Sequence, residues 1–443
     1  MTILKMITLN LFNVIILFFL PQFTFENFVV YEVTAFNPHE RELLYSLHVK
    51  NTSNIFLNGV SNEAALPMKV IVETNAAQAF EDKLNAYGIQ YTSVSFISEA
   101  QIKHKKVFTS SFNISKDFYN WENILAWINT QEKSGIFKKT VIAKTFERRD
   151  IFFLKLSEGK IKPIVFILGG EDALDWMSSA VILNLLEEFL KKSDLSMLLN
   201  IFDFYLLPIL NPDGFVYTKK QDRLWVKNRR ELFPRRKCAD GNFAVGVNIA
   251  RNWFLQKSYK MVDGVCNSVY IGTKALSEEE TKSLSYVLNS LAKNMIAFIN
   301  IRGFGRFITV PYEHMNIYSN INYDIVMEIL KSTSYKVHEK HNVSRYYVTA
   351  TSSIFYNFSG NIADWVKFKL NIPIVYTIYL ERIETVLPLP QHIELLKKEF
   401  FTILNESMLL ANDIYGPLFN NQRMIVTYFP INTMYLLFYM IFK

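Results

Sequence analysis

The chain has 443 residues, of which 50% are hydrophobic and 15% aromatic. This composition excludes a disordered protein, and the length allows two or three domains, each with a core of its own. The formal net charge is +7, and basic residues come closest together at 229–230 and 235–237. We interpret that segment as a solvated basic loop without exposed aromatic residues beside it, so nucleic acid is not an expected partner.

The N-terminus predicts entry into the secretory route. Lys5 precedes an apolar stretch over residues 9–20, so residues 1–25 are predicted to be a signal peptide. The two cysteines, Cys238 and Cys266, are then expected to form one disulfide in an oxidising compartment. Glycosylation is expected at the Asn-x-Ser/Thr sequons, which lie at Asn51, Asn113, Asn342, Asn357 and Asn405.

Short strands and amphipathic helices alternate over residues 27–106. Residues 28–33 and 68–72 are β-branched and aromatic and predict strands, whereas residues 76–87 predict a helix with one polar face. This alternation is typical of a small open α/β sandwich.

Residues 107–416 predict a second and larger α/β domain. A helix is expected to begin at Tyr119, and it is followed by strand candidates that alternate with long helices. The strands are predicted at 141–146, 151–156 and 164–168, and the helices at 176–191, 277–293 and 392–410. We therefore expect a mixed sheet with helices on both faces.

Residues 417–443 form a hydrophobic C-terminal tail. From Met424 to Phe442 nearly every residue is apolar, with Pro430 and Asn432 as interruptions. Such a tail is typical of a membrane span or of the removable signal for a lipid anchor. A divergent extension of the domain is the alternative interpretation.

The most informative motif follows the strand at 164–168. Residues 169–176 read Gly-Gly-Glu-Asp-Ala-Leu-Asp-Trp, with Asp172 and Asp175 three apart where a strand gives way to a helix. This turn resembles the zinc-binding turn of the secreted metallocarboxypeptidases of the A/B type, which reads Gly-Gly-Ile-His-x-Arg-Glu-Trp. The resemblance extends over nearly the whole chain. It implies that residues 27–106 are a propeptide, which covers the active site until it is cleaved from residues 107–416.

The same resemblance implies a zinc site whose three ligands are all replaced. The family holds zinc with two His and one Glu, and the first two positions are Asp172 and Asp175 here. The third ligand ends a strand, where this chain reads Ala297-Phe-Ile-Asn-Ile-Arg302. A guanidinium stays protonated and has no lone pair for a metal. We therefore expect no metal cofactor, and zinc only if the family function survives.

The family positions for the base and the electrophile are also replaced. Tyr379 stands at the general-base position, and a phenol is a poor base at neutral pH. Val226 stands where the family has the arginine that polarises the scissile carbonyl, and a valine cannot stabilise an oxyanion. No catalytic residue is therefore expected to be intact.

Positions that dock the substrate in the family are better kept. By resemblance, Arg251 grips the terminal carboxylate of a peptide, Tyr356 closes over the peptide, and Arg223 belongs to the substrate-binding set. Ala363 stands at the selectivity position of the side-chain pocket. It brings no acid that would favour basic side chains, so we expect a preference for large apolar ones.

We expect Arg302 to occupy the former metal position and to fork onto Asp172 and Asp175. The resulting function hypothesis is a secreted, catalytically inactive pseudo-carboxypeptidase that binds the C-termini of peptides or proteins. One alternative is an active metallocarboxypeptidase that removes C-terminal apolar residues. Another is a structural or membrane-linked interaction protein, attached through the C-terminal tail. The sequence does not indicate an oligomeric state.

Overall fold

The computed structural model describes most of the chain between residues 26 and 420. The described ranges are 26–50, 55–57, 67–98, 113–157, 159, 161–238, 241–253, 264–303, 305–312, 321–354, 359–380 and 389–420. The predicted signal peptide, Tyr356 with its neighbouring sequon, and the apolar tail beyond residue 420 lie outside these residues. Within the described residues, no helix is both long and apolar enough to span a bilayer.

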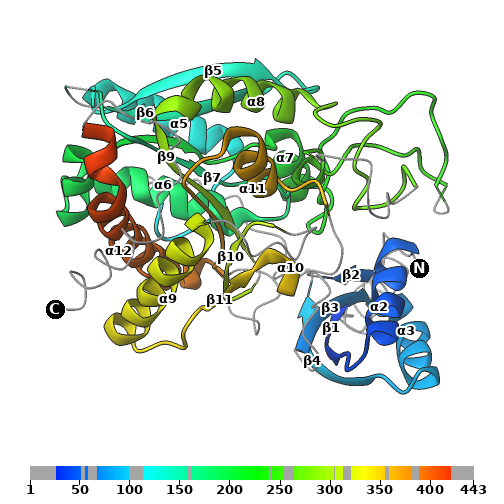
Figure 1. Cartoon of the computed structure of the whole chain (residues 1–443). Coiled ribbons are helices and arrows are strands. Elements are labelled where there is room, and N and C mark those ends of the chain that lie inside the picture. The colour runs from blue at the N-terminus through cyan, green and yellow to red at the C-terminus, as the bar shows by residue number, and fades with distance from the viewer. Residues whose placement is uncertain are drawn as a thin grey trace, which may run out of the picture.

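The N-terminal unit is a four-stranded antiparallel sheet with two helices (Figure 1). Its strand order is β2-β3-β1-β4. Alternate residues of β1, Val29, Tyr31 and Val33, enter one core with Phe80 of the second helix, as the two-residue period of a strand requires. The elements are β1 (Glu26–Thr34), α2 (Pro38–Lys50), β2 (Ile55–Leu57), β3 (Pro67–Glu73), α3 (Thr74–Ala86) and β4 (Gln90–Ser98).

The larger unit is built on an eight-stranded mixed sheet, in the order β11-β10-β12-β9-β7-β8-β6-β5. The four central strands, β12, β9, β7 and β8, are parallel, whereas β6 and β5 at one side run antiparallel to their neighbours. The strands are β5 (Lys138–Lys144), β6 (Asp150–Leu156), β7 (Ile164–Leu168), β8 (Asp203–Leu207), β9 (Met295–Arg302), β10 (Phe307–Val310), β11 (Tyr347–Ala350) and β12 (Ile374–Tyr379).

Helices cover both faces of this sheet, and each face has its own apolar core. In β7, Val165 and Ile167 enter the core of one face, whereas Ile164, Phe166 and Leu168 enter that of the other. The first core takes residues from α5, α6, α9 and α12, and the second from α8 and α11. The helices are α5 (Trp121–Gln131), α6 (Trp176–Leu190), α7 (Pro212–Lys220), α8 (Glu279–Leu291), α9 (Ile321–His341), α10 (Thr351–Ile354), α11 (Ile362–Trp365) and α12 (Ile393–Asn420).

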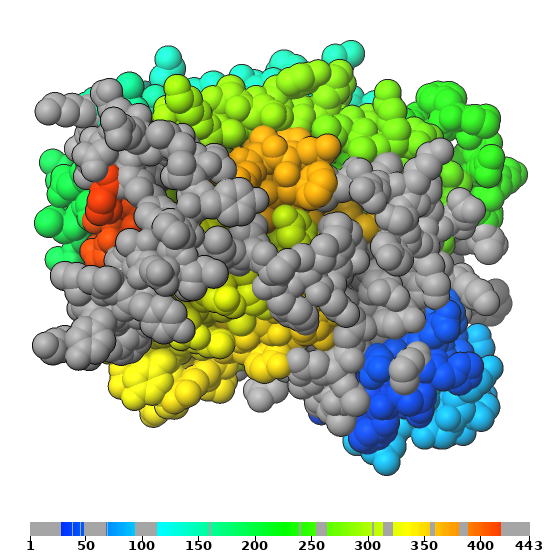
Figure 2. All heavy atoms as spheres, viewed as in Figure 1, coloured from blue at the N-terminus to red at the C-terminus, as the bar shows by residue number. Residues whose placement is uncertain are grey.

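This architecture confirms the predicted mixed sheet with helices on both faces, and most predicted elements lie within a few residues of the observed ones. Two helices differ from expectation. The predicted helix at 392–410 continues to Asn420 as α12, with Pro417 inside it. The 21-residue helix α9 was not predicted, because its sequence carries charged and polar residues through most of its length. In the space-filling view the blue N-terminal unit lies at the lower right of the molecule (Figure 2).

Candidate functional site

The parallel order of the central strands brings the motif residues together at one edge of the sheet. Leu168 at the end of β7 pairs with Asn300 of β9, and Arg302 at the end of β9 pairs with Tyr379 at the end of β12. The turn after β7 therefore faces the last residues of β9 and β12. Ligands of open α/β sheets bind at this carboxyl edge, so it is the first place to look for a site.

The turn after β7 is fixed by a glycine and by the cap of the following helix. Gly170 has φ +63°, and a Cβ there would lie 2.8 Å from the Cα of Ile209, so this position favours glycine. Asp175 is the N-cap of α6: its carboxylate accepts from the backbone N–H of Ser178 at 3.0 Å and from that of Gly303 at 2.8 Å. The Asp175 side chain thus serves the start of α6 and the end of β9.

Arg302 lies against the turn and pairs with its acids. One terminal nitrogen of the guanidinium contacts the carboxylate of Asp172, and the other lies 3.8 Å from Glu171 Oε2. The Arg302 side chain is 18% exposed. The expected pairing of Arg302 with Asp172 and Asp175 is therefore confirmed for Asp172 and wrong for Asp175. Asp172 is one partner, but the second acid is Glu171, because both oxygens of Asp175 are taken by backbone N–H groups.

Glu171 and Asn300 belong to this cluster and were not singled out from the sequence. The side-chain amide of Asn300 donates to Glu171 Oε2 at 2.6 Å, and both residues are buried. The only signal in the sequence was an acid at a position where the family motif has isoleucine. Three buried oxygens of the cluster, Glu171 Oε1, Asp172 Oδ1 and Asn300 Oδ1, have no hydrogen-bond donor among the residues that the structure describes.

The charges of the cluster act on one another through a medium with little water. Burial raises the pKa of the Glu171 carboxyl to about 7, although Arg302, Asn300 and Arg251 act to lower it. Burial alone would lower the pKa of the Arg302 guanidinium, but the charges of Asp172, Tyr379 and Glu171 raise it above its ordinary value. The guanidinium is therefore a permanent positive charge at this edge of the sheet.

The family base and electrophile positions face the same region without offering acid–base chemistry. Tyr379 is 9% exposed and packs with Ile354 and Phe307, and the guanidinium carbon of Arg302 lies 6.0 Å from its ring centre. Val226 is also buried, and its backbone carbonyl accepts from the N–H of Ala173 at 3.0 Å. Val226 thus holds the turn in place through its backbone, while its side chain is apolar.

Arg251 and the pocket segment are held close together on the other side of the cluster. Arg251 ends the short 3-10 helix Ile249–Arg251, and its carbonyl oxygen would lie 2.3 Å from a Cβ at position 360, where the chain has Gly360 with φ +92°. The N–H of Trp253 donates to the carbonyl of Gly360 at 3.0 Å. Ala363 is 4% exposed and lies in the same apolar cluster as Trp253. The predicted carboxylate clamp and the pocket position are therefore neighbours.

Arg223 has a structural environment. Its guanidinium lies over the ring of Trp176, at 3.5 Å, and donates to the backbone carbonyl of Leu174 at 2.7 Å. The residue is only 6% exposed. Arg223 therefore links the turn after β7 to the start of α6, and the peptide-binding proposal does not depend on it.

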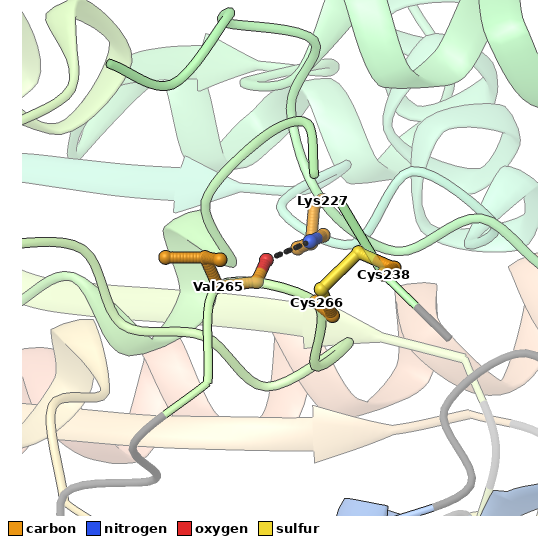
Figure 3. Close-up of a disulfide and its surroundings, with 4 residues drawn as sticks. All are labelled: Lys227, Cys238, Val265 and Cys266. Carbon is orange, nitrogen blue, oxygen red and sulfur yellow. Dashed lines mark hydrogen bonds between the residues drawn. A yellow bond between two sulfur atoms is a disulfide. The ribbon is translucent and has the colours of Figure 1, made fainter. Parts of the chain in front are cut away.

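The predicted disulfide is present at the far end of the site segments. Cys238 and Cys266 are bonded, with their Cα atoms 5.7 Å apart. Beside the bond, the buried ammonium of Lys227 donates to the carbonyl of Val265 at 3.0 Å (Figure 3). Burial, assisted by the charge of Arg229, lowers the pKa of Lys227 to about 7. The covalent bond and the hydrogen bond tie the same two segments together.

The cluster does not fit the zinc ion of the family. Within the described residues, no three His, Cys, Asp or Glu side chains gather as a metal site. Asp175 is used by two backbone N–H groups, and the nearest group to Asp172 is the cation of Arg302. A metal and a guanidinium would compete for the same negative charge. We therefore derive no catalytic step through a metal.

Comparisons with known proteins agree on one family. The family model described as zinc carboxypeptidase matches residues 124–402. A zinc carboxypeptidase of Simulium vittatum is 30% identical over 268 residues, which cover 59% of this chain and 85% of that protein. Zinc carboxypeptidase A 1 of Anopheles gambiae is 25% identical over 366 residues, which cover 80% of this chain and 82% of that protein.

Solved structures show the same fold. The crystal structure of carboxypeptidase A from Helicoverpa armigera superposes with a TM-score of 0.75 at 21% identity, covering 87% of this chain and 98% of that one. With the mixed eight-stranded sheet and the motif frame at its carboxyl edge, these matches define the class. The chain belongs to the zinc carboxypeptidase family.

Proposed function

We propose that this protein is a secreted, catalytically inactive member of the family that binds the C-termini of peptides or proteins. The observation that carries the proposal is the contact of Arg302 with Asp172, which puts a fixed cation against the first metal-ligand position. The retained Arg251 and the apolar surroundings of Ala363 support the binding half of the proposal. The Cys238–Cys266 disulfide supports an oxidising, extracellular destination.

The loss of catalysis rests on the chemistry of three positions. Family peptide hydrolysis needs a metal to lower the pKa of water, a base to take its proton and a cation to stabilise the oxyanion. Here a guanidinium, a packed phenol and a valine occupy those places: Arg302, Tyr379 and Val226. Each replacement alone lowers the rate by orders of magnitude, and none supplies what another lacks.

Peptide binding in this proposal depends on the charge of Arg251 and on the apolar residues around Ala363. A carboxylate that pairs with Arg251 gains a charge-assisted hydrogen bond. Ala363 and Ile362 belong to the apolar core around Trp253 and Trp365, whose ring centres are 5.3 Å apart. An apolar C-terminal side chain is therefore the favoured ligand. In the same proposal, residues 27–106 act as a propeptide that must leave before a peptide enters.

The test is binding and turnover with one labelled peptide that ends in leucine. We expect the purified protein without residues 1–106 to bind the free-carboxylate peptide and to bind its C-terminal amide at least tenfold more weakly, since a charged hydrogen bond is worth about 1.5–3 kcal/mol. Mass spectrometry of the bound peptide after long incubation should show no loss of leucine.

Matched variants separate the clamp from a general charge effect. Arg251→Ala should lower affinity for the free carboxylate to that of the amide. Arg345→Ala removes an exposed arginine that stacks on Tyr335 between α9 and β11, and it should leave affinity unchanged. Release of leucine would contradict inactivity. Equal binding of carboxylate and amide would contradict recognition of the C-terminus.

A further inference from the structure

The basic segment at 229–237 is not used by the function proposed so far. Its first two arginines are structural: the guanidinium of Arg229 lies 3.7 Å from the ring centre of Tyr217, and Arg230 makes two hydrogen bonds to the buried Glu278, at 2.7 and 2.8 Å. Arg235, Arg236 and Lys237 have no such buried partner acid. All three are exposed.

These three cations stand on a hairpin, which we call the basic arm and define as residues 231–238 and 241–245. Its two sides are bridged between Glu231 and Val245 and between Lys237 and Phe243. The N–H of Ala244 donates to the carbonyl of Arg236 at 2.8 Å. The disulfide to Cys266 fixes the turn end of the hairpin, where the N–H of Gly241 donates to the carbonyl of Cys238 at 3.0 Å, and the Lys227 hydrogen bond lies just before the first strand (Figure 3). The arm is therefore held at both ends, and its exposed cations lie between them.

The two sides of the arm combine these charges with exposed rings, contrary to the expectation from the sequence. Phe233 is 74% and Phe243 49% exposed. The guanidinium carbon of Arg235 lies 5.9 Å from the first ring centre and 5.6 Å from the second, and the ammonium of Lys237 lies 5.9 Å from Phe243. Exposed aromatic rings beside arginine are typical of binding surfaces.

The charge of the arm is partly offset by acids of the same hairpin. Residues 231–245 carry three cations and two acids, Glu231 and Asp240, and Glu231 lies 2.8 Å from Arg235. Both side chains of that pair are about half exposed, so water and a negatively charged partner compete for Arg235 at little cost. Arg236 and Lys237 add charge with no acid within salt-bridge distance in the part of the chain that the structure describes.

The arm connects two segments that contribute residues to the candidate site. One side leads back to Val226, and the other leads on to Arg251. The two sides are joined just below the arm, where the N–H of Asn228 donates to the carbonyl of Val247 at 2.9 Å. In Figure 1 these green loops extend at the right-hand side of the sheet, and green atoms form the right-hand edge of the molecule in Figure 2.

We propose that the basic arm is a docking surface for an acidic segment of the peptide or protein whose C-terminus enters the site. The proposal rests on the proposed function, because it places the partner's C-terminus near Arg251. An extended chain covers about 3.3 Å per residue, so the nine steps from Val226 to Arg235 span about 30 Å when fully extended. Acidic residues about nine or more positions before the C-terminus can therefore reach the cations of the arm.

Continuity with the site favours a peptide over the other polyanions. Three cations on one hairpin are too few to follow a nucleic-acid backbone. Arg235 lies within cation–π distance of both phenyl rings, so the rings are already engaged with a cation and are not a free apolar face for a lipid layer. A carboxylate can pair with the outer edge of the same guanidinium while the rings support it.

The experiment compares two labelled peptides that share an apolar C-terminal residue. The acidic peptide carries four glutamates beginning nine residues before the C-terminus, and the neutral peptide has glutamine at those positions. We expect the protein without residues 1–106 to prefer the acidic peptide about 5- to 10-fold at low salt, and to lose the preference at 1 M salt.

Two triple variants assign the preference to the arm. The arm variant Arg235→Gln, Arg236→Gln, Lys237→Gln should bind both peptides as the wild type binds the neutral one. The control variant Lys331→Gln, Lys336→Gln, Lys340→Gln removes the same charge from the exposed side of α9 and should keep the preference. Unchanged melting temperatures for both variants confirm that the fold is intact.

The outcomes separate this inference from the function on which it rests. Equal affinity for the two peptides at low salt overturns the docking proposal while leaving C-terminal binding intact. Arm-dependent binding of the acidic peptide that survives amidation of its C-terminus supports docking and contradicts carboxylate recognition. Arm-dependent binding to heparin or to phosphatidylserine vesicles, without any peptide preference, overturns the peptide assignment.

Discussion

Two neighbouring turns at the carboxyl edge of the sheet are built alike but satisfied very differently. After β8, Asn211 caps α7 by accepting from the N–H of Gly214 at 3.0 Å. The following Asp213 is fully buried, and its carboxylate accepts from Thr145 Oγ1, from the N–H of Glu147 and from Arg149, at 2.7 to 2.8 Å. After β7, Asp175 caps α6 in the same way, but Glu171 Oε1 and Asp172 Oδ1 have no donor.

The difference shows that one turn is fully satisfied by its own fold and the other is not. Buried polar groups of a folded domain are normally satisfied, so an oxygen without a donor calls for an explanation. The turn after β8 has a complete set of donors. In the turn after β7, Arg302 supplies a positive charge for Asp172 and Glu171, while the described residues do not supply every hydrogen bond.

The largest effect is expected from breaking the satisfied turn. Asp213→Ala removes the buried acceptor of three donors and leaves Arg149 without its buried partner, which should lower the free energy of unfolding by roughly 3 to 5 kcal/mol. Urea denaturation followed by circular dichroism measures the loss. A change below about 1 kcal/mol would show that the turn after β8 is no better supported than the turn after β7.

An intermediate effect is expected from Arg302→Met. The variant leaves Asp172 and Glu171 without their counter-charge, so it should lose about 2 to 3 kcal/mol at pH 7, less than Asp213→Ala because water reaches this partly exposed corner. Unpaired carboxyls bind protons more readily, and the deficit should therefore shrink toward pH 4.

Asp172→Asn in the Arg302→Met background provides the control, because it removes charge from the same corner. It should restore part of the lost stability. A deficit in the single variant that is constant from pH 4 to pH 8 would mean that Arg302 acts through packing and not through charge.

The effect of Glu171→Gln is expected to be the smallest at pH 4, and it grows as pH rises. Because the pKa of Glu171 in the folded protein is raised to about 7, the folded state holds this proton more tightly than the unfolded chain does. In the wild type, the contribution of Glu171 to the free energy of unfolding is complete below the pKa of the unfolded chain, ~4.3, and it decreases as pH rises toward 7. The variant should therefore gain on the wild type by up to about 1.4 kcal/mol per pH unit in that window.

Thermal unfolding of wild type and Glu171→Gln at pH 4, 5.5 and 7 measures this gain. A difference in melting temperature between wild type and variant that is the same at all three pH values would show that Glu171 is ionised in the folded state. Arg302 and Asn300 would then offset its burial completely.

Much of the site was predictable because the motif frame fixes which strand ends meet. The contact of Arg302 with Asp172 follows from that frame. The expected partner Asp175 was wrong, because the start of α6 needs an N-cap and that local demand uses both carboxylate oxygens. The part played by Glu171 could not be predicted, since the direction of one side chain in a turn is decided by tertiary packing.

The basic arm illustrates the same limit at the surface. Apolar residues are expected inside a protein, so Phe233 and Phe243 gave no sign in the sequence that they stand exposed beside three cations. Their exposure depends on the disulfide beside the turn of the hairpin and on the pairing of its two sides, and sequence patterns do not predict that pairing. The cysteines predicted the disulfide but not the surface that it supports.

The central claim is that a guanidinium has replaced the metal of the family. The most direct test is the zinc content of the purified protein after exposure to excess zinc and gel filtration, measured by inductively coupled plasma mass spectrometry beside an active carboxypeptidase. We predict that the protein retains no bound zinc and releases no C-terminal residue. One equivalent of zinc per chain together with peptide hydrolysis would contradict the account.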